Sequence, residues 1–234
     1  MFGKVLSFLK KPRFTACGNS AETVNETDFK YLAKDKKNKR LKEIFSHIPK
    51  LETQRLLLRR VEEGDCADVF EYSADLDVTK YLTWQPHVHI AETKRHLAEI
   101  QKRYDNGQYY DWGMEYKENG CLVGTCGFTS VDTGKNACEV GYVLSKKYWG
   151  KGLVPEALER IMEFAFDYIG FETIEARFLD GNVKSKKVME KVGMVYSKTE
   201  NKSLFVRDGF KTVYTYSITK EAFESRKNAK QKYL

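Results

Sequence analysis

The sequence predicts an α/β (α+β) fold, in which a mixed, mostly antiparallel central sheet of about six to seven strands is flanked by about four helices. Short β-prone runs joined by tight turns alternate with longer stretches of helical periodicity. Hydrophobic residues make up 41% of the chain, which contains 14 Tyr and 14 Phe, so a packed core is expected.

The first part of the chain predicts one strand, two helices and three further strands. Leu56 to Arg60 is an apolar, strand-like run, and acids at 62–65 favour a helix start. Asn119-Gly120 is typical of a tight hairpin. The expected elements are a strand at 56–60, helices at 62–74 and 91–104, and strands at 109–117, 121–130 and 137–144.

The second part predicts two helices, each followed or preceded by strands. Pro155 fits the first turn of a helix, so this helix is expected to begin near Leu153 and to end at Gly170. A strand at 173–178 precedes a helix that Asn182 caps and Gly193 ends. Strands at 204–207 and 210–218 pair across Asp208-Gly209.

The basic residues gather at the two ends of the chain. The net charge is +7, and residues 1–50 contain 12 Lys and Arg against 5 Asp and Glu. We therefore expect a basic extension at 1–49, partly helical or disordered, a domain at 50–219, and a basic tail at 220–234. Such an extension favours ribosomal or RNA contact, whereas a solvated helix face is the simpler explanation of the lysine run at 34–42.

The five cysteines show no CxxC pair and no spacing typical of zinc, so reduced thiols and a cytoplasmic location are expected. The apolar run at 5–9 is too short for a signal sequence or a membrane span.

The strand at 137–144 leads into a glycine-bearing loop and then a helix. Amides at a helix N-terminus favour an anion, and Gly150 and Gly152 let a ligand approach the main chain. A diphosphate fits this arrangement; a tight turn without a ligand is the alternative. Pro155 stands where a dinucleotide motif needs a third glycine, and the spacing of a nucleotide hydrolase loop is absent.

This stretch resembles the coenzyme A loop of the GCN5-related N-acetyltransferases (GNAT), whose pattern is Gln/Arg-x-x-Gly-x-Gly/Ala. Here it reads Lys147-Tyr148-Trp149-Gly150-Lys151-Gly152, with Lys in place of Gln or Arg. The opening LETQRLLLR, TWQPH, LVGTCGF, CEVGYVL and GNVKSKKVMEKVG extend the resemblance from Leu51 to Ile218. The similarity is greatest to the branch that contains the ribosomal-protein N-terminal acetyltransferases.

The resemblance implies acetyl-CoA as the donor, a direct transfer in a ternary complex, and no metal. It assigns the coenzyme to a set of residues around this loop and around the helix at 183–192: Tyr142, Val143, Leu144, Lys147, Trp149, Gly150, Lys151, Gly152, Leu153, Asn182 and Ser185.

The same resemblance assigns the catalytic roles to Glu139 and Ser185. Many family members outside this branch carry, four residues after the Ser, a Tyr that protonates the departing thiolate; Met189 stands there in this chain. Ser185, directly or through water, takes that role, and Glu139 resembles the base or water-holding residue. A solvent-facing carboxylate for Glu139 and a helix cap for Asn182 are the structural alternatives.

The loop at 84–87 resembles the segment that overhangs the acceptor groove. Trp84, Gln85, His87 and, on a neighbouring strand, Trp112 are therefore expected to contact the acceptor; the aromatic residues could equally belong to the core.

The expected function is acetylation of a primary amine, with a protein N-terminus such as that of a ribosomal protein as the acceptor. A polyamine or aminoglycoside acceptor, or a non-catalytic coenzyme A-binding or RNA-associated protein, is the alternative. The protein is expected to be a monomer or a homodimer.

Overall fold

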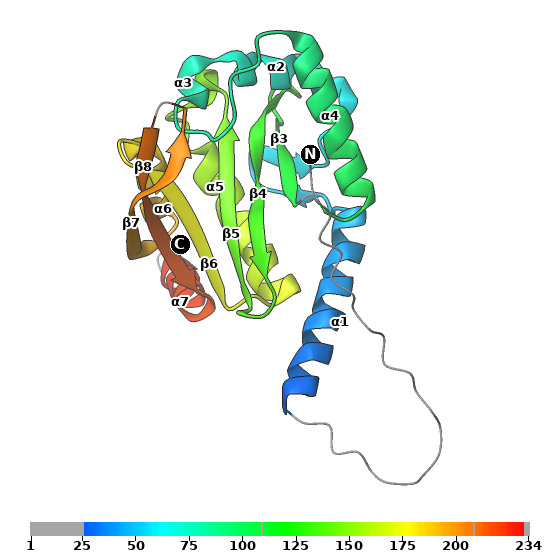
Figure 1. Cartoon of the computed structure of the whole chain (residues 1–234), viewed down its shortest axis with the longest axis vertical. Coiled ribbons are helices and arrows are strands. Elements are labelled where there is room, and N and C mark those ends of the chain that lie inside the picture. The colour runs from blue at the N-terminus through cyan, green and yellow to red at the C-terminus, as the bar shows by residue number, and fades with distance from the viewer. Residues whose placement is uncertain (1–25, 109, 208, 232–234) are drawn as a thin grey trace, which may run out of the picture.

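The computed structural model describes residues 26–108, 110–207 and 209–231. Its centre is one eight-stranded sheet in the order β1-β2-β3-β4-β5-β6-β8-β7 (Figure 1). Its strands are β1 (Leu51–Glu52), β2 (Leu56–Arg59), β3 (Asp111–Tyr116), β4 (Leu122–Asp132), β5 (Ala137–Leu144), β6 (Thr173–Leu179), β7 (Val195–Val206) and β8 (Gly209–Thr219). Only β5 and β6 pair in parallel; the other neighbours are antiparallel.

Helices cover both faces of the sheet. They are α1 (Glu26–Ser46), α2 (Cys66–Ala74), α3 (Leu76–Thr79), α4 (Ile90–Asp105), α5 (Leu153–Glu163), α6 (Val183–Lys191) and α7 (Lys220–Gln231), with 3₁₀ turns η1 (Glu63–Asp65) and η2 (Lys146–Tyr148) and the π-helical η3 (Phe164–Ile169). In Figure 1, α5 and α6 lie behind the sheet and α4 lies in front of its right-hand side. The expected fold class is confirmed; β1 is the strand that was not predicted, and β7 begins at Val195, well before the expected strand at 204–207.

Two apolar clusters hold the layers together. The larger cluster joins α5 and η3 to the back of the sheet through buried residues such as Leu158, Ile161 and Phe166. The smaller cluster packs α2 and α4 on the opposite face through Val69 and Leu97. Burial of these side chains supplies the main stabilisation of each layer.

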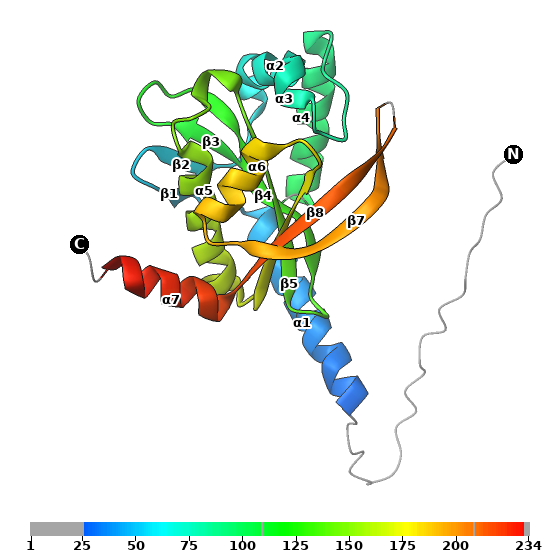
Figure 2. The same cartoon turned by 90° about the vertical axis from the view of Figure 1, so that its left-hand side faces the viewer.

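The segments on either side of the expected domain also donate side chains to the core. Phe45 of α1 is fully buried, and its ring packs edge-on against Trp112. Phe223 of α7 is buried against Phe166, whereas the sequence indicates only a basic tail there. Figure 2 shows α7 leaving the end of β8 on the side opposite to the projecting β7/β8 hairpin. The boundaries at 49/50 and 219/220 stay predictions.

Two further expectations concern the cysteines and the absence of a membrane-spanning helix. Cys66, Cys121, Cys126 and Cys138, the cysteines within the described ranges, are free thiols. None of the helices in those ranges is both long and apolar enough to cross a membrane.

Candidate active site

The site begins where two parallel strands stop pairing. β5 and β6 pair from Ala137 with Thr173 to Val140 with Ala176, but β5 continues to Leu144 while β6 follows β8. Ser145 N–H donates to Val123 O on the β4 side. Main-chain groups alternate along a strand, so the N–H of Tyr142 and of Leu144 point to the opposite side, into the β5/β6 gap.

The loop after β5 has the geometry of an anion site. Gly150 and Gly152 have φ values of +78° and +76°, and α5 begins at Leu153, as predicted. Tyr148 N–H and Trp149 N–H donate to Ser145 O and Lys146 O, so these two amides belong to the η2 turn. The amides of residues 150–154 have no acceptor among the described residues and lie at the positive end of the α5 dipole.

An ion pair with a residue about 100 positions earlier in the sequence holds this loop in place. Arg55 Nε donates to Glu156 Oε2 at 2.7 Å, and Arg55 Nη1 donates to Lys151 O at 2.9 Å. Thr53 Oγ1 donates to Glu156 Oε1 at 2.6 Å. Burial alone would raise the pKa of Glu156, but the hydrogen bonds from Thr53 and Arg55 outweigh it and lower that pKa.

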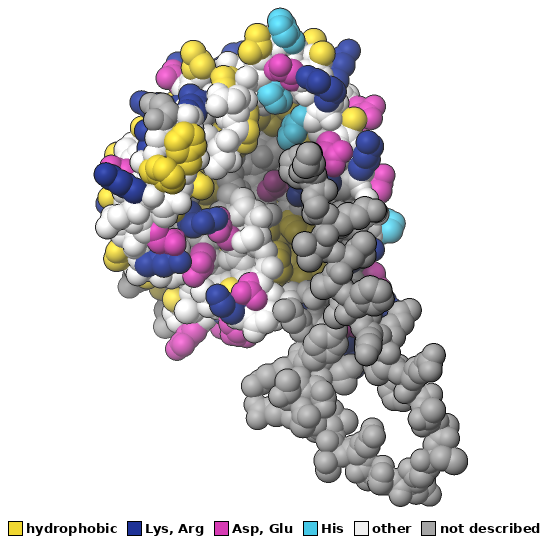
Figure 3. All heavy atoms as spheres, in the orientation of Figure 1, with side chains coloured by type: hydrophobic (Ala, Val, Ile, Leu, Met, Phe, Trp, Pro, Cys, Tyr) yellow, Lys and Arg dark blue, Asp and Glu magenta, His cyan; other side chains and the backbone are white. Residues whose placement is uncertain are grey.

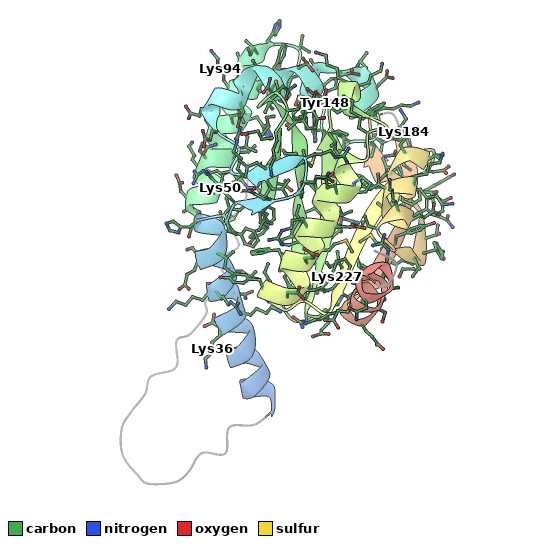
Figure 4. All side chains as sticks on the ribbon, turned by 180° about the vertical axis from the view of Figure 1, so that it is seen from behind. Lys36, Lys50, Lys94, Tyr148, Lys184 and Lys227 are labelled. Carbon is green, nitrogen blue, oxygen red and sulfur yellow. The ribbon has the colours of Figure 1, made fainter. Side chains whose placement is uncertain are left out.

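A cavity of about 880 Å³ opens beside the loop and is lined by basic side chains. Gly150, Gly152, Leu153, Trp149 and Ser185 are among its lining residues. The lysines that line it are Lys80, Lys146, Lys184, Lys187 and Lys191. Figure 4 shows Lys184 on α6 and Tyr148 near the N-terminal end of α5. We refer to this space as the donor cavity; its charge and its free amides suit a ligand that carries several phosphates.

A second cavity, of about 510 Å³, extends to the opposite face of the sheet, which is visibly hollowed in Figure 3. We refer to it as the acceptor cavity. Residues that line both cavities mark where they meet: Tyr81, Leu82, Tyr142, Val143, Asn182 and Ser185. The β5/β6 gap therefore connects a phosphate-binding surface on one face with a separate cavity on the other.

Ser185 lies at this junction, in the first turn of α6. Asn182 caps the helix, since its side chain accepts a hydrogen bond from Ser185 N at 3.3 Å. Ser185 Oγ is 2.9 Å from the hydroxyl of Tyr142, which is also 3.1 Å from Ser185 O. Burial raises the pKa of Tyr142 well above its ordinary value, so the phenol stays protonated at neutral pH.

Glu139 lines the acceptor cavity but its carboxylate already has partners. Arg177 Nε is 2.8 Å from Glu139 Oε2, and Thr129 Oγ1 donates to Glu139 Oε1 at 3.0 Å. Only 16% of the Glu139 side chain is exposed. The carboxylate is therefore held in place by one cation and one hydroxyl.

Of the four residues expected to contact the acceptor, two line the acceptor cavity and two do not. Trp84 and His87 line the acceptor cavity, whereas Gln85 is exposed and does not. Burial lowers the pKa of His87, whose Nδ1 lies 2.8 Å from Thr93 Oγ1. His96, not singled out in the sequence, lies beside His87, with 5.8 Å between their ring centroids.

The expectation for Trp112 is wrong. Its side chain is fully buried in the larger core cluster, and its Nε1 donates to Pro49 O at 2.7 Å. Successive side chains of a strand point to opposite faces, and the preceding residue, Asp111, is the one that lines the acceptor cavity. Trp112 therefore stabilises the packing of α1 and η3 on the sheet instead of contacting an acceptor.

Two basic residues expected at the coenzyme, Lys147 and Lys151, line neither cavity. Lys147 Nζ pairs with Glu71 at 2.6 Å, and Lys151 Nζ lies 4.9 Å from the centre of the Tyr148 ring. By contrast, Tyr142, Val143, Leu144, Trp149, Gly150, Gly152, Leu153 and Asn182, all expected at the coenzyme, line the donor cavity. No set of His, Cys, Asp and Glu within the described ranges could hold a metal ion; metal-free chemistry stays a prediction.

The family model described as an acetyltransferase (GNAT) domain matches residues 55–195. The chain belongs to the GNAT acetyltransferase family. This GNAT protein is an N-acetyltransferase, and its family uses acetyl-CoA as the donor, as the resemblance implied.

This GNAT protein is similar to known proteins in sequence and in fold. It is 28% identical, over 74% of its length and 97% of the relative, to the uncharacterized N-acetyltransferase p20 of Bacillus licheniformis. It is 26% identical, over 63% of its length and 80% of the relative, to the [ribosomal protein uS5]-alanine N-acetyltransferase of Escherichia coli. A GNAT acetyltransferase from Bacillus anthracis superimposes with a TM-score of 0.66, at 26% identity, over 74% of this chain and 99% of that structure.

Replacing Gly150 tests whether the open main chain of the loop binds the donor. We expect Gly150→Ala to weaken acetyl-CoA binding at least about tenfold, because the new methyl group occupies space that is empty in the structure. The measurement is titration calorimetry with acetyl-CoA.

Gly170→Ala is the matched control. Gly170 has a similar φ of +81°, an added Cβ would also find nothing within 4 Å there, and the residue lies at the far end of η3. Both variants should lose similar stability, since both force Ala into a left-handed conformation. Equal acetyl-CoA affinities of the two variants would contradict the loop assignment.

Replacing Glu156 tests the ion pair behind the loop through its pH dependence. A carboxylate with a lowered pKa stabilises the folded state above its unfolded pKa of about 4.5, and this contribution is lost as the pH falls through the folded value. Glu156→Gln should therefore cost about 1–2 kcal/mol of unfolding free energy at pH 7 and less below pH 4.5. Urea unfolding over this pH range measures the difference.

Glu190→Gln serves as the comparison, since that half-exposed carboxylate lies 3.6 Å from Lys186 on the surface of α6. It should change the unfolding free energy by no more than about 0.5 kcal/mol. A constant cost of Glu156→Gln at every pH would show that lost packing, not charge, is responsible.

Proposed function

We propose that this N-acetyltransferase transfers the acetyl group of acetyl-CoA directly to the N-terminal α-amine of a protein. The observation that carries the proposal is the connection of two cavities through the β5/β6 gap, with Tyr142, Val143 and Ser185 in both linings. Donor and acceptor can then enter from opposite faces and meet in one complex, which removes the need for an acyl-enzyme.

The residues present fit the donor. Acetyl-CoA supplies an activated thioester together with phosphates that suit the amides of residues 150–154 and the lysines of the donor cavity. The Tyr142 N–H points into the gap, where it can donate to a carbonyl oxygen as negative charge develops. Ser185 O–H lies at the same junction and can stabilise a sulfur that leaves as a thiolate.

The pKa of the acceptor amine favours an α-amine over a lysine. An α-amine has a pKa of about 7.7 to 8.0 and is partly neutral at pH 7, whereas a lysine amine, at about 10.4, needs a base. Glu139 is ion-paired with Arg177 and lines the acceptor cavity, where it can hold an incoming amine or a water. The Escherichia coli relative, whose name specifies the alanine of a ribosomal protein, supports the same class of acceptor.

A panel of acceptors tests the proposal. A peptide with a free N-terminus and no lysine should be acetylated at least about tenfold more efficiently at pH 7 than the same peptide with a blocked N-terminus and one lysine. This preference should narrow as the pH rises toward 9, because the neutral fraction of the lysine amine then rises about a hundredfold, whereas that of the α-amine rises only about tenfold. Faster transfer to a polyamine or an aminoglycoside would contradict the proposal and support the small-molecule alternative.

Acetyl-CoA binding with no transfer to any amine would instead support a non-catalytic role. Contact with a ribosome or RNA through residues 1–49, a cytoplasmic location, and a monomeric or homodimeric state remain predictions. Residues 1–25 of that extension lie outside the described residues.

A further inference from the structure

The helix position from which many family members present a phenol is apolar in this chain. Met189 lies one helical turn after Ser185, is 1% exposed, and lines the acceptor cavity. A thioether has no proton to donate. Any second hydroxyl that assists the leaving sulfur therefore has to come from an element other than α6.

The neighbouring strand brings such a hydroxyl to Ser185. Tyr142 of β5 places its phenol oxygen 2.9 Å from Ser185 Oγ and 3.1 Å from Ser185 O. Both residues line both cavities, so the pair lies at the junction where the donor and the acceptor meet. The Tyr142 side chain packs against the larger core cluster, which restricts the movement of its ring.

We propose that Tyr142 is a positioning residue that orients the Ser185 hydroxyl toward the leaving sulfur. The inference rests on the proposed acetyl transfer. The single phenol proton of Tyr142 can be donated to Ser185 O or to Ser185 Oγ. When the coenzyme sulfur occupies the junction, Tyr142 O–H donates to Ser185 Oγ, and Ser185 O–H then points to the sulfur as its donor. Consecutive hydrogen bonds polarise one another, so the serine becomes a stronger donor than it is alone.

The proton balance requires no other reactant. The amine nitrogen forms the new C–N bond and loses one proton, while the C–S bond breaks and the sulfur gains one. Where Ser185 passes its proton to sulfur, the proton that leaves the amine replaces it through solvent. Tyr142 keeps its own proton throughout, consistent with a buried phenol.

The pKa of the thiol of bound CoA tests the pair without any acceptor. Thiolate absorbance of the CoA complex is followed against pH in the full-length protein, in Tyr142→Phe and in Ser185→Ala. A donor aimed at sulfur stabilises the thiolate, so the wild-type complex should lower the thiol pKa by about one unit from its free value near 8.5. Both variants should return it toward the free value, while a shift unchanged in Tyr142→Phe would overturn the inference.

A double-mutant cycle on turnover then separates positioning from binding. Tyr142→Phe should lower kcat about tenfold and change acetyl-CoA affinity less than about threefold, and it should have no further effect in a Ser185→Ala background. Tyr104→Phe is the control; this buried phenol donates to Asp111 O, lines neither cavity, and should leave kcat within about twofold.

Additive losses, or an equal loss of acetyl-CoA affinity, would assign Tyr142 a role independent of Ser185 and overturn the inference. Because the thiol titration needs no acceptor, a wild-type protein that binds CoA with a lowered thiol pKa but acetylates no amine would reject the proposed function alone.

Discussion

The early end of pairing between β5 and β6 is the constraint on which the site depends. Past Val140 and Ala176, β5 and β6 no longer pair with each other, and a gap opens between them. Each strand stays in the sheet because it remains paired with its other neighbour. A gap inside a sheet leaves main-chain donors of one strand without strand partners, at a cost unless a ligand or water satisfies them. Here the Tyr142 N–H lies in that gap, between a cavity on one face and a cavity on the other.

The other parts of the site are arranged around this gap. The glycine loop follows directly from β5, so the free amides of residues 150–154 lie close to it in the chain, and the Arg55–Glu156 pair fixes the loop from behind. On the β6 side, Asn182 starts α6 and holds Ser185 in its first turn. Glu139 and Arg177 form an ion pair across β5 and β6 close to where their pairing stops. Binding, orientation and proton transfer are thereby assigned to different elements.

Local signals predicted much of this arrangement. The glycines and Pro155 predicted the loop and the start of α5, and Asn182 predicted the cap of α6, because each feature depends on residues within one or two turns. The apolar run before the loop likewise predicted the eight-residue strand β5.

Features that depend on tertiary contacts could not be predicted in this way. Arg55 and Glu156 are 101 residues apart, and Tyr142 and Ser185 are 43 residues apart, so neither pair leaves a pattern in the sequence. Trp112 was assigned to the wrong face because strand alternation reverses with a single residue of register. Phe223 is the one large apolar residue of the charged helix α7, and its packing on Phe166, 57 residues earlier in the chain, leaves no local pattern in the sequence.

A crystal structure of the complex with coenzyme A tests the central claim most directly. The account predicts pyrophosphate oxygens within hydrogen-bond distance of the amides of residues 150–154, and the coenzyme sulfur at the junction beside Ser185 Oγ and the Tyr142 N–H. A coenzyme bound with its pyrophosphate away from this loop, or with its sulfur outside the β5/β6 gap, would contradict it.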